Sequence, residues 1–194
     1  MCIRDRDFLA HDILPLIPEE GSVGASGDLT PLSYVAATLA GEREVMYHGE
    51  RRSAAEVHQE LAWQPLVLRP KEALALMNGT AVMTGLACLA FARADYLLKL
   101  ATRITALNVV ALQGNPEHFD ERLFAAKPHP GQMQVAAWLR QDLAIDAPTA
   151  PLHRLQDRYS LRCAPHVLGV LADSLGWLRS FIAVSYTHLT LPTN

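Results

Sequence analysis

The sequence lacks the marks of several large classes of protein. Its cysteines, Cys2, Cys88 and Cys163, are an odd set without metal-site spacing, so we expect no disulfide framework and a reducing, cytoplasmic compartment. A net charge of −3 provides no basic surface for nucleic acid or for an anionic membrane. We find no internal repeat, no low-complexity segment, no apolar leader and no Ser-His-Asp or Cys-His arrangement. At 194 residues, half of them apolar, the chain suits one good core or part of a larger one.

One long stretch, residues 73–92, carries no charged residue and reaches the length of a membrane span. Arg93, Asp95 and Lys99 follow on what we predict to be the same helix. We therefore expect a helix that is buried on all sides in a large bundle, with a membrane span as the alternative. From Thr80 to Gln113 the chain has no proline, and so long a helix implies packing partners beyond this chain.

Helix start and stop signals predict an all-α fold dominated by long helices. Thr30 as cap and Pro31 at the first helical position predict a helix to Leu39 or Ala40, ending at Gly41. A small hairpin is expected near residues 43–53, where Ser53 would cap the next helix. Further helices are expected from Pro70 with a break at Asn78-Gly79, from Thr80 to about Gln113, from Val135 to Leu143 and from His166 to Ala183.

The most informative stretch is the glycine-rich loop at residues 21–31, Gly-Ser-Val-Gly-Ala-Ser-Gly-Asp-Leu-Thr-Pro. A loop of this kind before a helix can simply be a turn or an anion cradle. Asp28 argues against an anion, and the loop has no Gly-Lys-Ser/Thr ending. The preceding residues 12–18 contain two prolines, so we do not expect the clean strand that a dinucleotide fingerprint requires.

A covalent interpretation fits the loop better. In Ala25-Ser26-Gly27, the Gly27 nitrogen could attack the Ala25 carbonyl carbon and close a five-membered ring. Loss of water from the ring and of the Ser26 hydroxyl would then leave an electron-poor methylidene group. Glycine leaves the attacking nitrogen unhindered, and the positive pole of the following helix would strengthen the electrophile.

Residues 21–36, GSVGASGDLTPLSYVA, resemble the signature of the aromatic amino-acid ammonia-lyases and related aminomutases. The resemblance implies a methylidene-imidazolone (MIO) formed autocatalytically from Ala25, Ser26 and Gly27, with no external cofactor and no metal. Gly24 and Asp28 would support the loop. It also implies the long-helix bundle of the ammonia-lyase (fumarase/aspartase-like) type and a homotetramer whose active sites draw on several subunits.

A second patch is Gln156-Asp-Arg-Tyr-Ser-Leu-Arg162, whose spacing puts Gln156, Tyr159 and Arg162 on one side of a helix or tight turn. An arginine can hold a carboxylate with two parallel hydrogen bonds, and a tyrosine hydroxyl can relay a proton. The alternative is a solvated face with an Asp157-Arg158 pair. The patch is similar to the family's Gln-Asp-x-Tyr-x-Leu-Arg segment, which implies a catalytic Tyr159, a carboxylate-binding Arg162 and a nearby Gln156.

Other polar residues are less informative. Asn78 in an apolar run needs hydrogen-bond partners, either as a backbone clamp at a helix break or, as the resemblance implies, at the MIO oxygen or the substrate. The scattered His118, His129 and His153 favour surface or turn positions over a metal site. His166 stands where the family has glutamine, and we assign it no role.

The resemblance implies elimination of ammonia from histidine, phenylalanine or tyrosine to give an α,β-unsaturated acid. The substrate stays open, because residues 78–81 favour the phenylalanine/tyrosine branch and the glycine loop favours the histidine branch. An aminomutase would share the electrophile. From another class, the chain could be a non-catalytic helical assembly module whose loop binds an anion.

The likeness extends from Phe8 to Ala183, so we predict that residues 7–183 are an internal part of the lyase domain. We interpret residues 1–6 and 184–194 as non-native ends. The family's other catalytic tyrosine lies upstream of the glycine loop, so we expect the 194-residue chain to be inactive by itself.

Overall fold

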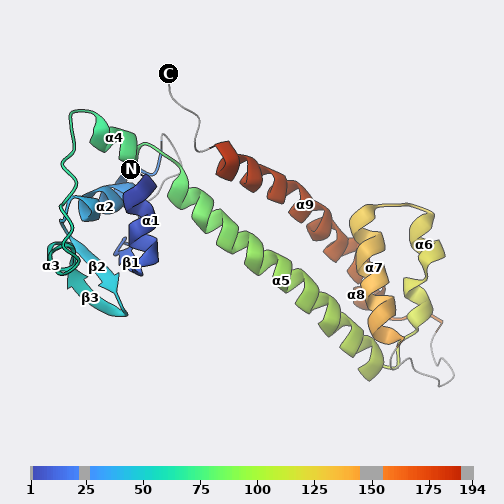
Figure 1. The fold of residues 1–194 in the computed structure, drawn as a ribbon. Helices are drawn as coiled ribbons and strands as arrows, with labels where there is room; N and C mark the ends of the chain where they lie inside the picture. Colours follow the sequence, from blue (N-terminus) through green and yellow to red (C-terminus); the bar gives the residue numbers. More distant parts are fainter. Residues whose placement is uncertain (1, 22–26, 145–154, 189–194) are drawn as a thin grey trace. The chain divides into compact units, whose positions relative to one another are not determined.

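The computed structural model describes residues 2–21, 27–144 and 155–188. In these ranges the chain is mainly helical and carries one small antiparallel sheet (Figure 1). The predicted helical fold with a hairpin near residues 43–53 is confirmed. The chain divides into two compact units, one up to Leu86 and one from Ala87 to His188, and each is described by itself.

The N-terminal unit combines short helices with the sheet. Its elements are α1 (Cys2–Ala10), β1 (Ile13–Pro15), α2 (Leu29–Leu39), β2 (Glu44–Tyr47), β3 (Glu50–Ser53), α3 (Ala54–Glu60), α4 (Glu72–Met77) and the first turns of α5 (Ala81–Ala111). Strand β2 pairs antiparallel with β1 on one side and β3 on the other. The core of this unit consists of Phe8, Ile13, Leu39, Val45, Tyr47, Ala54 and Val57.

Strand β1 corrects one expectation. The two prolines of residues 12–18 led us to expect no clean strand, yet Ile13–Pro15 pairs with Val45–Tyr47. The strand is short and lies at the sheet edge, where a proline without an N–H costs no ladder hydrogen bond on the open side. Leu16 then donates its N–H to the Glu44 carbonyl, 3.2 Å away.

Three helix boundaries also differ from the expectation. Helix α2 begins at Leu29 with Asp28 as its N-cap, so Thr30 is not the cap and Pro31 lies within the first turn. Helix α7 begins at Pro130, because proline fits a first helical position, and not at Val135. The last helix continues to His188, beyond the predicted end at Ala183.

The C-terminal unit is a helical assembly that includes the remainder of α5. It contains the short helix η1 (Pro116–Phe119), then α6 (Glu121–Ala125), α7 (Pro130–Leu143), α8 (Tyr159–Arg162) and α9 (Ala164–His188). Its core joins side chains of α5, η1, α7, α8 and α9, namely Leu98, Ala106, Val109, Phe119, Val135, Leu139, Leu143, Leu161 and Leu175. An ion pair between Arg103 and Asp142 adds a polar link between α5 and α7.

Helix α5 is not buried on all sides, so that expectation is wrong for this chain. Leu89, Leu97 and Leu107 are exposed along it, as are several large apolar side chains of α9. By length and composition alone, residues 72–111 and 159–185 could each cross a membrane. The charged Arg93, Asp95, Lys99 and Arg103 in mid-helix favour a protein-covered surface over lipid.

Helices α7 and α9 approach most closely through two glycines. A Cβ placed on Gly169 would lie 2.5 Å from the Gln132 nitrogen, and one placed on Gly131 would overlap the Gly169 carbonyl oxygen. The Gly131 N–H donates to the Asp173 carboxylate over 2.8 Å, which fixes the same crossing. Glycine is therefore required here for space.

Replacing Gly169→Ala should lower the free energy of unfolding of the C-terminal unit. Overpacking costs about 1–3 kcal/mol, which exceeds the roughly 1 kcal/mol that alanine gains over glycine inside a helix. Gly176→Ala on the same helix is the matched control, since a Cβ there meets nothing within 4 Å, and it should stabilise. Urea unfolding followed by Trp138 fluorescence, with Trp63 and Trp177 replaced by phenylalanine, measures both; equal effects would contradict the packing argument.

The N-terminal unit also buries a histidine, His58, which is 2% exposed. Phe8 and Trp63 pack on its ring with centroids 5.7 and 5.9 Å away, and neither ring nitrogen has a hydrogen-bond partner among the described residues. Burial, and then the nearby Arg4 charge, lowers the His58 pKa below its ordinary 6.5. The fold therefore holds this histidine neutral.

Stability of the N-terminal unit should fall on acidification. Since the folded state disfavours the protonated ring, the stability present above pH 6.5 is lost progressively below it. His58→Phe should flatten the dependence of the unfolding free energy between pH 7 and pH 5, whereas His48→Asn, at an exposed hairpin position, should not. Trp63 fluorescence at several pH values tests this, and an unchanged slope in the His58 variant would refute it.

Candidate active site

The C-terminal end of the glycine loop lies against the break between α4 and α5. The Asp28 N–H donates to the Gly79 carbonyl over 2.6 Å, which joins segments some fifty residues apart in sequence. The predicted helix break at Asn78-Gly79 is confirmed, with Asn78 as the C-cap of α4. Gly24, Ala25 and Ser26, on which the covalent interpretation depends, lie outside the described residues.

Gly27 occupies a position that only glycine suits. Its φ of +99° falls in the region that disfavours other residues. A Cβ on Gly27 would lie 2.7 Å from the Asn78 side-chain oxygen and 3.1 Å from the Gly79 nitrogen. The structure thus brings the predicted residues Gly27 and Asn78 together, with the Asn78 carboxamide directed at the loop.

Asp28 connects the starts of two helices. It is 1% exposed, and its carboxylate accepts the Met83 N–H in the first turn of α5 over 2.8 Å. Its carbonyl accepts the Leu32 N–H of α2 at 3.0 Å. The N-termini of α2 and α5 therefore both adjoin Asp28, and the positive poles of both helices act on the loop. Such a site favours electron density on a bound group.

The second predicted patch lies in the C-terminal unit. Tyr159 and Arg162 form the two ends of α8, with the Arg162 Cζ 5.8 Å from the Tyr159 ring centre. Tyr159 is 71% exposed, and a hydrogen bond with the Cys163 side chain raises its pKa against the opposing charge of Arg162. Gln156 precedes α8 and is exposed, so it does not share a helical face with the other two.

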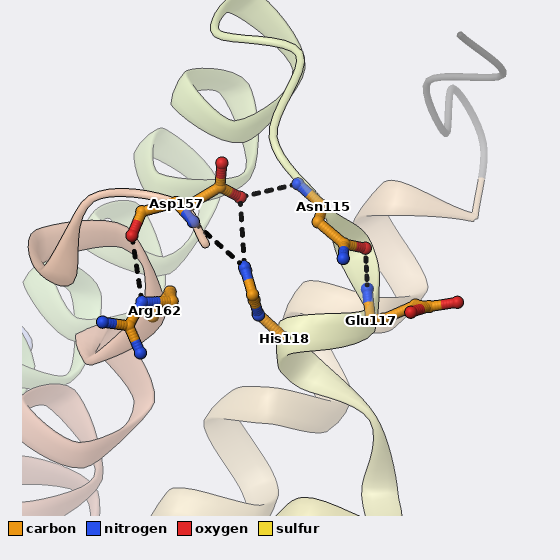
Figure 2. Close-up of polar contacts among 5 residues, drawn as sticks. All are labelled: Asn115, Glu117, His118, Asp157 and Arg162. Atoms are coloured by element: carbon orange, nitrogen blue, oxygen red, sulfur yellow. Dashed lines mark hydrogen bonds and ion pairs between the residues drawn. The ribbon is translucent and has the colours of Figure 1, made fainter. Parts of the chain in front are cut away.

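The sequence did not reveal the contacts of Asp157 (Figure 2). We considered it one half of a solvated Asp157-Arg158 pair, but its side chain is only 10% exposed and accepts the Asn115 N–H over 2.6 Å. Its backbone N–H donates to His118 Nε2 over 3.2 Å. Gly114-Asn115-Pro116, directly after the predicted helix end near Gln113, was an available signal.

Of the other histidines considered in the sequence analysis, those that the structure describes lie in packing or helix-capping positions. His166 packs its ring on Phe124 with centroids 5.4 Å apart, and His129 precedes α7 as its N-cap. His153 lies outside the described residues. Across residues 2–21, 27–144 and 155–188, no group of three or more His, Cys, Asp or Glu side chains gathers as a metal site would require.

The predicted site residues thus form two groups, each inside one unit. Gly27, Asp28 and Asn78 meet in the N-terminal unit, and Tyr159 and Arg162 meet in the C-terminal unit. The first group offers a strained loop under two helix poles. The second offers a guanidinium and a phenol, the pair suited to an amino-acid carboxylate and a mobile proton.

Comparison with known proteins gives consistent matches along the chain. A family model described as aromatic amino acid lyase matches residues 4–190. The histidine ammonia-lyase of Koribacter versatilis is 42% identical over 181 residues, covering 92% of this chain and 35% of that protein. The histidine ammonia-lyase of Chloroflexus aurantiacus is 44% identical over 187 residues, covering 95% and 36%. The chain therefore spans about a third of the length of these relatives.

Solved structures agree. The phenylalanine aminomutase of Pantoea agglomerans superposes with a TM-score of 0.81 at 32% identity, covering 91% of this chain and 37% of that one. The histidine ammonia-lyase from Trypanosoma cruzi gives a TM-score of 0.75 at 35% identity, covering 94% and 33%. These matches confirm the ammonia-lyase type of helical fold.

Asp28→Ala should destabilise the N-terminal unit by about 1–3 kcal/mol, because the Met83 N–H in the first turn of α5 loses a buried, charged acceptor. Asp120→Ala is the matched control. Asp120 also accepts a backbone N–H, that of Arg122 at 2.9 Å, but its side chain is 33% exposed, so the loss should be clearly smaller. Urea unfolding decides, followed by Trp63 fluorescence for Asp28→Ala and by Trp138 fluorescence for Asp120→Ala, because each probe lies in the unit that its variant affects, with the other two tryptophans replaced by phenylalanine in each case. Similar losses would contradict the role of Asp28.

Proposed function

Because the chain belongs to the aromatic amino acid lyase family, we propose that it is part of an ammonia-lyase that converts an aromatic amino acid into ammonia and an α,β-unsaturated acid. The observation that carries this proposal is the close approach of Gly27, Asp28 and Asn78 beneath the N-termini of α2 and α5. A plain turn would not need a glycine packed against a carboxamide under two positive helix poles.

The residues around Gly27 fit a methylidene-imidazolone formed from Ala25, Ser26 and Gly27. A Cβ on Gly27 would meet the Asn78 side chain, and the positive φ of Gly27 is one that glycine adopts without strain. When present, the group supplies the electrophile that ammonia elimination requires. No external cofactor and no metal is needed for this proposal.

The chain's own residues would then prepare the site. Asp28 holds the loop by its N–H to Gly79 and by its carboxylate to Met83. Asn78 places a carboxamide beside Gly27, where it can hydrogen-bond the modified loop or the substrate. The poles of α2 and α5 stabilise negative charge that develops there during the reaction. Gly24 would give the loop its remaining freedom.

Arg162 would bind the substrate carboxylate, and Tyr159 would take part in proton transfer. The guanidinium is half-buried next to the exposed phenol, an arrangement that suits an anionic ligand approaching from solvent. The Cys163 side chain raises the pKa of Tyr159 above its ordinary value near 10, so at neutral pH the phenol is protonated with or without the shift and can donate. Gln156, exposed just before α8, would contribute a further polar contact.

Histidine is the first substrate to test. The two curated relatives described above, at 42% and 44% identity, are named histidine ammonia-lyases. An aminomutase is the second candidate, since the Pantoea agglomerans structure is a phenylalanine aminomutase with a TM-score of 0.81. An aminomutase would give a β-amino acid in place of released ammonia.

The exposed apolar faces of α5 and α9 fit the proposal of a larger, cytoplasmic assembly. Side chains such as Leu97 and Leu107 are unfavourable in water and would be covered by the rest of a full-length protein and by other copies in a homotetramer. The small aromatic amino acid is then the expected partner, with neither nucleic acid nor membrane involved.

The intact mass of the full-length protein tests the modification directly. Formation of the ring removes two water molecules, so the protein should be lighter than its sequence by that amount, and Ser26→Ala should restore the sequence mass. The same variant should lower the elimination rate by several orders of magnitude, because the electrophile is lost. Ser33→Ala, on α2 and outside the loop, is the control and should leave both quantities unchanged.

Product analysis with histidine, phenylalanine and tyrosine then separates the remaining possibilities. An unsaturated acid with free ammonia identifies a lyase, and a β-amino acid identifies an aminomutase. A full-length protein with an unmodified loop and no turnover of the three amino acids would refute the proposal and leave the helical assembly module, with its anion-binding loop, as the better interpretation.

A further inference from the structure

Asp157 uses all of its polar groups inside the C-terminal unit (Figure 2). Its carboxylate accepts the Asn115 N–H over 2.6 Å, and its N–H donates to His118 Nε2 over 3.2 Å. Its carbonyl accepts the Arg162 Nε–H at 2.9 Å. One residue therefore connects the end of α5 and the start of η1 to the guanidinium on α8.

The surroundings hold the Asp157 carboxylate in place. A Cβ on Gly114 would lie only 2.9 Å from its Oδ2 and 3.1 Å from Val109 Cγ1, so the glycine leaves just enough room. The His118 side chain, 17% exposed, lies on another side with Nε2 3.7 Å from the carboxylate. A largely buried charge with defined partners has little freedom to move.

This arrangement determines which nitrogens of the Arg162 guanidinium are available to bind a carboxylate. Nε is occupied by the Asp157 carbonyl, whereas Nη1 and Nη2 donate to no other residue in the part of the chain that the structure describes. A carboxylate can then bind only end-on, through the two Nη groups. Loss of the anchor would let the guanidinium rotate and would offer several binding geometries in place of one.

We propose that Asp157, held by Asn115 and His118, is a positioning residue that orients Arg162 for the substrate carboxylate. The inference rests on the proposed function, in which Arg162 binds that carboxylate. Neither Asp157 nor His118 touches the ligand in this scheme; both act through the Arg162 Nε contact. Their removal should therefore weaken carboxylate recognition without weakening recognition of the aromatic ring or the amine.

The test compares ligands with and without the carboxylate. In full-length protein with Ser26→Ala, which prevents turnover, calorimetry measures binding of L-histidine and histamine, L-phenylalanine and phenethylamine, and L-tyrosine and tyramine. For the amino acid that binds, Asp157→Ala should lower affinity about tenfold, roughly the contribution of one charge-assisted hydrogen bond. Affinity for the matching amine should change less than about twofold.

A second pair of variants keeps the test decisive if Asp157→Ala fails to fold. His118→Ala removes the acceptor of the Asp157 N–H and should give the same selective loss. His118→Gln restores a side-chain acceptor and should recover most of the affinity. Asp120→Asn is the matched control, since Asp120 also accepts a backbone N–H. It should change the affinity for neither ligand. Circular dichroism confirms the fold of each variant.

The outcomes separate this inference from the proposed function. Arg162→Lys should lower the affinity for the amino acid at least as much as Asp157→Ala does. The positioning role is wrong if Arg162→Lys lowers the affinity for the amino acid and the Asp157 and His118 variants do not. It is also wrong if those variants lower the affinities for the amino acid and for the matching amine equally. If Arg162→Lys has no effect, or none of the three amino acids binds, the proposed function fails and this inference fails with it.

Discussion

The buried carboxylate of Asp28 is the contact on which the group formed by Gly27, Asp28 and Asn78 in the N-terminal unit depends. Without it, the first turn of α5 would lose the acceptor of its Met83 N–H. The backbone N–H of the same residue holds the glycine loop against Asn78-Gly79 through the Gly79 carbonyl. The loop, the helix break and two helix starts are therefore a single structural unit.

Asp157 serves the C-terminal unit in a related way. In both places an aspartate binds backbone N–H groups of a distant segment, while the side chains suited to chemistry point elsewhere. Backbone groups of the same two aspartates bind beside Asn78 and at Arg162. The Asp28 N–H donates to the Gly79 carbonyl, and the Asp157 carbonyl accepts the Arg162 Nε–H. Carboxylates suit this task, because a charged acceptor binds an N–H about twice as strongly as a neutral one.

Local signals in the sequence predicted much of the fold and part of the site. The long helix, the hairpin and the break at Asn78-Gly79 follow from proline, glycine and apolar spacing, which act over a few residues. The edge strand Ile13–Pro15 was missed because its pairing depends on residues some thirty positions away. The Asp157 contacts were missed for the same reason, since Asn115 and His118 reach it across about forty residues. The exposed side of α5 carries the same kinds of apolar residue as its buried side, so the sequence pattern did not distinguish burial from exposure.

The uncovered apolar side of α5 has a consequence for how this polypeptide behaves in a cell or a test tube. Leu89, Leu97 and Leu107 expose apolar surface to water along this one long helix. Because association buries such surface, the fraction of associated molecules should rise with protein concentration and fall on dilution. When this chain is produced alone, its tendency to associate therefore has to be controlled before its activity can be measured.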